Sequence, residues 1–112
     1  MYVIAYNVCM KEIKFYTTEQ GKCYFKEWFN KIDNSYKQRV IKRLNQLEDG
    51  NYGDSKKLSA DLSELRLNFG SGYRIYYTET ETTIVLILCA GDKSSQSKDI
   101  EKAKQIIIEI KE

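Results

Sequence analysis

Residues 62–77 alternate between apolar and polar side chains, which predicts two short β-strands joined by a glycine turn at 70–72. Successive side chains of a strand point to opposite faces of the sheet. One face of this hairpin is therefore expected to be apolar and the other polar. The apolar face is expected to carry Leu65, Leu67, Phe69, Tyr73, Ile75 and Tyr77.

The polar face of the hairpin carries the candidate chemistry. A turn that pairs the residues on either side of 70–72 would set Asn68 opposite Arg74 and Arg66 opposite Tyr76. Two arginines, an amide and a phenol would then share one sheet face, backed by an apolar face.

Two helices are predicted between residues 17 and 48 by apolar side chains that recur at helical spacing. Thr17 or Thr18 would cap the first helix, and Asp33-Asn34-Ser35 would end it and cap the second. Because the connection is short, the two helices should pack antiparallel across the sheet. The outer face of the second helix is basic, either as a solvated face or as a surface for phosphate or an acidic partner, and carries Lys37, Arg39, Lys42 and Arg43.

The chain after the hairpin predicts a buried strand and a terminal helix. Residues 83–89 are apolar on both faces, as in a central strand. The chain then passes through Gly91-Asp92-Lys93, and Ser97 would cap a helix whose apolar face docks on the sheet or on a partner. With a further strand at 11–16, the pattern predicts one α+β domain over residues 1–112.

Residues 1–9 are a candidate N-terminal extension, because Met10 could itself be a start codon. No apolar run reaches the roughly 18 residues that a membrane span needs. Cys9, Cys23 and Cys89 are widely spaced, which argues against a zinc site and favours reduced thiols in a cytoplasmic protein.

Composition narrows the chemistry further. The chain has no histidine, so a Ser-His-Asp triad is excluded and acid–base work would need Lys, Arg, Tyr, Asp or Glu. The net charge of +2 does not by itself point to a nucleic-acid partner. Only a clustering of positive charge on one surface would indicate such a partner.

Two segments are specific enough to point to a family. Residues 63–77 contain Ser-Glu-Leu-Arg followed by Gly-Tyr-Arg-Ile-Tyr-Tyr, and residues 90–96 read Ala-Gly-Asp-Lys-Ser-Ser-Gln. In this order and spacing they resemble the RelE/ParE toxin superfamily, most closely its HigB-like branch of addiction module killer proteins. The resemblance covers roughly residues 11–105.

The resemblance implies the toxin of a type II toxin–antitoxin pair. Its fold would be a curved antiparallel sheet with two N-terminal helices packed on one face and a C-terminal helix. Many RelE-like members cut mRNA on the ribosome without a metal or other cofactor, whereas ParE-like members inhibit DNA gyrase. The expected partners are mRNA on the ribosome and a cognate antitoxin, a small helix-turn-helix protein in this branch.

The candidate site residues combine this resemblance with the demands of metal-free RNA cleavage. A base must take the proton of the ribose 2′-OH, an acid must supply another proton, and cations must stabilise the phosphorane. Arg66, Arg74 and Lys93 are expected to hold the phosphate, and Lys57 or its neighbour Lys56 to act as base or electrostatic support. Substrate binding is expected from Lys56, Tyr76, Tyr73 and Asn68.

Two departures from the family pattern leave the general base unassigned. Asn68 stands where a second arginine is frequent, and no tyrosine or histidine follows Lys93 in residues 94–99. An inhibitor of DNA gyrase therefore stays open as an alternative function, as does an RNA-binding module without cleavage.

Overall fold

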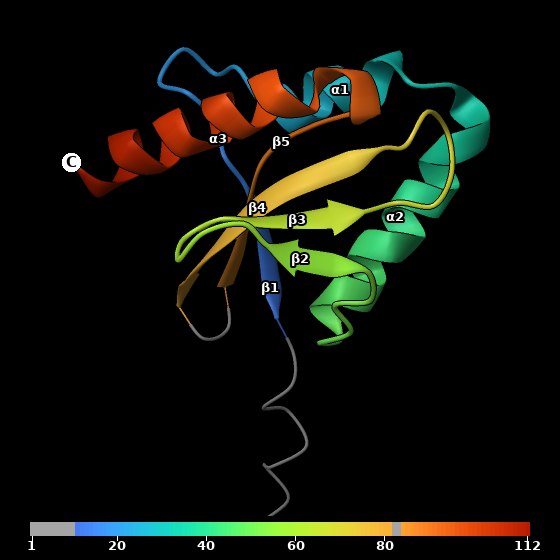
Figure 1. Cartoon of the computed structure of the whole chain (residues 1–112), viewed down its shortest axis with the longest axis horizontal. Coiled ribbons are helices and arrows are strands. Elements are labelled where there is room, and N and C mark those ends of the chain that lie inside the picture. Colours follow the sequence, from blue (N-terminus) through green and yellow to red (C-terminus); the bar gives the residue numbers. More distant parts are fainter. Residues whose placement is uncertain (1–10, 82–83) are drawn as a thin grey trace, which may run out of the picture.

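The computed structural model describes residues 11–81 and 84–112 (Figure 1). The candidate extension at 1–9 and the first residue of the predicted strand 83–89 lie outside the described residues. The strands are β1 (Glu12–Phe15), β2 (Ser55–Lys57), β3 (Ser63–Arg66), β4 (Arg74–Glu81) and β5 (Ile84–Gly91). The helices are α1 (Tyr24–Lys31), α2 (Asn34–Glu48), the short 3₁₀ helix η2 (Lys93–Ser95) and α3 (Gln96–Lys111).

The five strands form one sheet in the order β1-β5-β4-β3-β2. β1 runs parallel to β5, and the other neighbours are antiparallel. The predicted α+β fold is therefore confirmed, with a sheet that is mixed because of β1. The short edge strand β2 has no counterpart in the predicted elements. None of the helices in the described part of the chain has both the length and the apolar character that crossing a membrane requires.

α1 and α2 cover one face of the sheet. Apolar side chains from the two helices pack on the odd-numbered residues of β3 and β4, as the alternation of the hairpin predicts. The prediction of one apolar hairpin face is thus confirmed. The buried members of this core include Phe25, Val40, Leu44 and Leu47 from the helices, and Leu65, Ile75, Tyr77, Val85 and Ile87 from the sheet.

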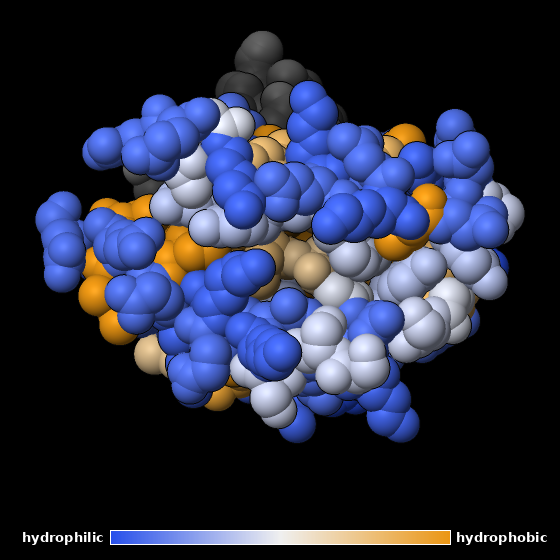
Figure 2. Space-filling model, turned by 90° about the horizontal axis from the view of Figure 1, so that it is seen from above, coloured by the Kyte–Doolittle hydropathy of each residue, from blue (hydrophilic) through white to orange (hydrophobic). Residues whose placement is uncertain are grey.

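α3 covers the opposite face, so the terminal helix docks on the sheet. β5 contains a β-bulge under this helix. Tyr76 pairs with Cys89 while Tyr77 pairs with Ile87, so Leu88 is an extra residue without a partner in β4. The exposed apolar residues of α3, Ile108 and Ile110, lie near its end. Figure 2 shows hydrophobic residues gathered on the side at which α3 ends in Figure 1. The second core consists of Ala103, Ile106 and Ile107 against Leu62, Tyr76, Leu88 and Cys89.

The helix starts follow the predictions in one case and depart from them in another. Asp33 caps α2, because its carboxylate accepts a hydrogen bond from the Ser35 N–H at 2.9 Å. The predicted threonine cap of α1 is wrong, because the Thr18 hydroxyl instead accepts from the Lys22 N–H at 3.0 Å, in a turn that precedes the helix. α1 begins only at Tyr24.

The terminal helical segment begins earlier than predicted, and Asp92 rather than Ser97 provides the side-chain cap. The Asp92 carboxylate accepts from the N–H groups of Ser94 and Ser95 at 2.9 and 3.3 Å. The helical segment therefore starts immediately after β5, with η2 leading into α3. This short connection fixes where Lys93 emerges from the sheet.

Gly91 ends β5 against the start of the terminal helical segment, where a side chain would meet Ser95 and Asp99. A Cβ atom here would lie 1.9 Å from the Asp99 Oδ2 atom and 2.6 Å from the Ser95 Oγ atom. That hydroxyl donates to the Asp99 carboxylate at 2.5 Å, so the first turn of α3 has little freedom to retreat. The docking of α3 therefore requires a glycine at this strand end.

We expect Gly91→Ala to lower the free energy of unfolding by about 1–3 kcal/mol, the range for over-packing a closed contact. Urea denaturation followed by circular dichroism measures the change. Asp99→Ala removes the carboxylate that the new methyl group would meet, so Gly91→Ala should cost less in that background. An equal cost in both backgrounds would show that this contact does not limit the docking.

Candidate functional site

The two arginines of the hairpin lie directly opposite each other on the polar face. Arg66 of β3 pairs with Arg74 of β4. The predicted register, with Arg66 opposite Tyr76, is wrong by two residues, because the loop spans residues 68–72 and the Leu67 N–H donates to the Tyr73 carbonyl at 2.9 Å. A shift of two residues keeps every side chain on its face, so the predicted polar face is correct although its pairing is not.

Glu64 lies buried beside these arginines. Its Oε2 atom is 3.1 Å from Arg66 Nε, and its Oε1 atom is 3.4 Å from Arg74 Nε. The Gln96 amide at the start of α3 donates to Oε1 at 2.9 Å. Glu64 is 0% exposed, and a carboxylate so enclosed requires partners of this kind. Strand alternation predicts Glu64 on the face of Arg66, where the two can pair, but the contact of the same carboxylate with Arg74 and Gln96 depends on the tertiary structure.

Lys93 joins the cluster from the start of η2. Its backbone N–H donates to the Ser71 carbonyl at 3.3 Å, which ties η2 to the hairpin loop. A Cβ atom on Gly72 would lie 3.2 Å from Lys93 Cβ and 3.7 Å from Arg74 Nη1, so the lysine and this arginine flank the same glycine. The structure thus brings together Arg66, Arg74 and Lys93, the three residues predicted to hold phosphate.

Asp92 holds Lys93 in this position. Besides capping η2, its carboxylate accepts from the Ser94 hydroxyl at 2.6 Å and from the Ser71 hydroxyl at 3.1 Å. These hydrogen bonds, that of Ser94 foremost, hold the pKa of Asp92 below its ordinary value. The ionised carboxylate therefore links the hairpin loop to the strand end that delivers Lys93.

A shallow groove of about 310 Å³ runs along the hairpin loop beside the arginines. Asn68 lies in this loop with its side chain exposed, rather than opposite Arg74 as predicted. Arg66, Arg74 and Asn68 all line the groove, so a ligand bound there can reach the amide and both guanidinium groups.

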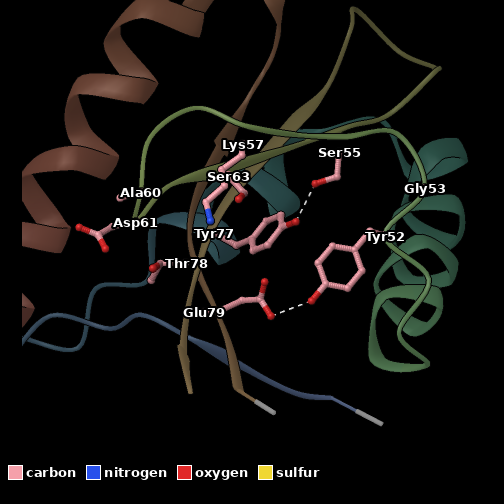
Figure 3. Close-up of a pocket in the computed structure, with 10 residues that line it drawn as sticks. All are labelled: Tyr52, Gly53, Ser55, Lys57, Ala60, Asp61, Ser63, Tyr77, Thr78 and Glu79. Atoms are coloured by element: carbon pink, nitrogen blue, oxygen red, sulfur yellow. Dashed lines mark hydrogen bonds between the residues drawn. The ribbon is translucent and has the colours of Figure 1, made fainter. Parts of the chain in front are cut away.

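The adjacent lysines of β2 point to opposite faces of the sheet. Lys56 pairs with Glu64 and Lys57 with Ser63, so Lys56 shares the face of the arginines and Lys57 does not. The structure therefore brings Lys56, and not the predicted Lys57, toward the cationic cluster. Figure 3 shows the cavity that Lys57 lines instead, together with Tyr52, Tyr77 and Glu79.

Tyr73 and Tyr76 are both buried. Tyr73 belongs to the α1/α2 core, where its ring packs edge-on against Trp28 and Tyr36 at centroid distances of 5.2 and 5.6 Å. Tyr76 lies under α3 with its hydroxyl near Glu64 but outside hydrogen-bond geometry. In this arrangement neither ring is available for the stacking on a base that the sequence predicted.

Burial also settles the protonation of the Tyr76 hydroxyl. Desolvation first, and then the negative charge of Glu64, raise the pKa of Tyr76 above its ordinary value. The phenol therefore stays protonated near neutral pH and is a poor candidate for a general base.

The basic face of α2 is partly structural. Arg43 donates to the Asn51 carbonyl at 3.1 Å and to the Tyr52 carbonyl, which anchors the loop after α2. The Arg39 guanidinium lies 4.2 Å from the centroid of the Phe69 ring, a cation–π distance. Arg43 is thus a structural member of this face, whereas Arg39 and Lys42 remain exposed.

Known proteins resemble this chain in sequence and in fold. Residues 27–110 match the model of a family described as "Phage derived protein Gp49-like". An uncharacterized protein of Haemophilus influenzae is 39% identical over 87 residues, which cover 77% of this chain and 88% of that protein. The E. coli toxin RelE, solved as a double mutant in the free state, has a TM-score of 0.61 and 18% identity over 87% of this chain and 98% of that chain. At this identity the RelE likeness shows a shared fold.

Asp92→Asn should cost stability at neutral pH and progressively less in acid. A carboxylate with a depressed folded pKa contributes stability above its unfolded pKa, about 3.9 for Asp, and that stability is lost as the pH falls through the folded value. Because Asn also serves as an N-cap, the difference between the two proteins reports mainly the charge. Urea titrations from neutral pH to about pH 3 measure it. A difference that does not change with pH would contradict this role of the charge.

Proposed function

The chain belongs to the Gp49-like family of phage-derived proteins, a family of the RelE/HigB toxin type, and from this premise we propose that it is the toxin of a type II toxin–antitoxin pair. We propose further that it belongs to the HigB-like branch and cleaves mRNA on the ribosome without a metal ion. The observation that carries this proposal is the direct pairing of Arg66 with Arg74 on one sheet face, with Lys93 beside them.

The proposed reaction makes defined demands on this cluster. The ribose 2′-oxygen bonds to the adjacent phosphorus and the bond to the 5′-oxygen breaks, while one proton leaves the 2′-OH and another reaches the 5′-oxygen. Negative charge grows on the non-bridging phosphate oxygens, where oriented guanidinium groups stabilise it best. Arg66 and Arg74, both held by Glu64, supply such groups, and Lys93 adds a third cation.

Lys56 is the residue that we assign to proton transfer or electrostatic support. It is exposed on β2 and shares the arginine face through its pairing with Glu64. Glu64 is engaged by both arginines and Tyr76 is enclosed, so neither is placed to take the proton. Asn68, exposed in the hairpin loop, is assigned to substrate binding.

The family implies an antitoxin partner, and we propose a small helix-turn-helix protein. The buried Tyr76 supports a second candidate function, a ParE-like inhibitor of DNA gyrase. A cationic surface without an accessible phenol can bind another macromolecule without catalysing proton transfer, so the arginine face serves either function.

We expect the wild-type protein, expressed in cells, to produce mRNA cuts in register with codons, which primer extension maps. Arg74→Ala and Arg66→Ala should each lower cleavage by about 10²- to 10³-fold, the usual loss when one transition-state donor is removed. Growth arrest with intact mRNA would contradict the ribonuclease. In that case, loss of supercoiling by purified gyrase in the presence of the protein would support the second candidate.

Lys56→Ala and Lys57→Ala form a matched pair, because the two lysines are adjacent in β2 and face opposite sides of the sheet. Lys56→Ala should reduce the cleavage rate substantially more than Lys57→Ala, since only Lys56 shares the face of the arginines. The rates of mRNA cleavage by the two purified variants measure the difference. A larger loss from Lys57→Ala would move the proton-transfer role to the cavity of Figure 3.

A further inference from the structure

Glu64 is the most deeply buried charged residue in the described part of the chain, and the proposed reaction gives it no direct step. We propose that Glu64 is a positioning residue that holds Arg66 and Arg74 as one oriented phosphate-binding pair. This inference rests on the proposed ribonuclease function and assigns to its site a residue that acts through the arginines.

The first support is electrostatic. Like charges directly opposite each other on neighbouring strands are destabilising, and Arg66 and Arg74 occupy such a pair. Glu64 gives one carboxylate oxygen to each guanidinium group, at 3.1 and 3.4 Å. The carboxylate therefore offsets the repulsion between two cations that the strand pairing places on one face of the sheet.

The second support is the atom that each arginine uses. Both guanidinium groups approach Glu64 through Nε, the atom nearest the backbone. The Nη groups lie beyond Nε along the side chain, and those of Arg66 make no hydrogen bond to another described residue, while Arg74 donates from Nη1 to the Gly72 carbonyl at 3.2 Å. The two Nη groups of Arg66 thus remain available to a phosphate, while Glu64 fixes the orientation of the guanidinium group through Nε.

The third support is the rigidity of the carboxylate itself. The Gln96 amide of α3 donates to the Oε1 atom at 2.9 Å and Arg66 Nε donates to the Oε2 atom at 3.1 Å, so hydrogen bonds to both oxygens fix the rotamer of Glu64. Arg74 adds an ion pair at 3.4 Å without a hydrogen bond from its Nε atom. Replacing buried ion pairs by apolar residues is often neutral or stabilising, so stability is a weak reason for a carboxylate at this place. Orientation of the two arginines is the role that its contacts support.

The test compares Glu64→Gln with Asp99→Asn, a matched change at the other buried carboxylate of the described chain. Asp99 accepts from the Ser95 hydroxyl and has no contact with either arginine. Two quantities are measured for each folded protein. They are the cleavage rate on ribosome-bound mRNA and the affinity for a 2′-O-methyl RNA oligonucleotide, which binds but cannot be cut.

We expect Glu64→Gln to lower the cleavage rate by about 10- to 100-fold, by analogy with the loss seen when the hydrogen-bond partners that orient metal ligands are removed. Binding of the 2′-O-methyl oligonucleotide should fall much less than the cleavage rate. Removing a negative charge beside the cations favours binding, whereas the exact orientation of the guanidinium groups matters most for the charge that grows on the phosphate in the transition state. Asp99→Asn should change neither the cleavage rate nor the affinity. Urea denaturation checks that this variant is folded under the conditions of both assays. Parallel losses of binding and cleavage, or an unchanged cleavage rate in Glu64→Gln, would overturn the positioning role.

A structural readout separates this inference from the proposed function. In the wild type, the side-chain Nε–H signal of Arg66 in ¹⁵N NMR spectra should be shifted and protected from exchange with water, because Nε donates to Glu64. The signal of Arg74, whose Nε lies 3.4 Å from Glu64 Oε1 without a hydrogen bond, should be shifted by the nearby charge. Glu64→Gln should weaken both effects, whether or not the protein cuts mRNA. If the wild type cuts no mRNA but the signals change in Glu64→Gln, the ribonuclease function is contradicted and the positioning role of Glu64 is supported. If the signals do not respond, the positioning fails.

Discussion

The strand β5 is the constraint on which the other elements depend, because it is buried on both faces. It pairs with β1 on one side and with β4 on the other, so it lies inside the sheet. Val85 and Ile87 enter the α1/α2 core, while Leu88 and Cys89 enter the α3 core. A strand with apolar side chains on both faces needs cover on both, so α3 has to return over the face that also carries the arginines.

The packing of α3 on this face determines which side chains of the candidate site remain exposed. α3 buries Tyr76 and brings Gln96 against Glu64, whereas Lys56 and Lys93 stay exposed. The accessible side chains are thus a group of cations beside a covered sheet, and the two tyrosines predicted to stack on a base, Tyr73 and Tyr76, lie inside the two cores. Such a surface favours contacts with the phosphate backbone over stacking on bases.

Much of the candidate site was predictable because strand alternation is a local property. It placed Arg66 and Arg74 on one face, and the order of the strands brought Lys93 to their side. The register was not predictable, because a shift of two residues leaves the faces unchanged and the apolar pattern cannot distinguish the two pairings. Likewise, the three residues of β2 are too few to show a period, so the sequence could not separate Lys56 from Lys57.

The sequence by itself determined the α+β class, the apolar and polar faces of the hairpin and the cap of α2 at Asp33, because each depends on residues near one another in the chain. The tertiary structure decided which helix covers the polar face and which residues that helix buries. It also decided the close approach at Gly91 and the contact of Glu64 with Gln96, 32 residues further along the chain. These features depend on distances between segments, which no local pattern of side chains records.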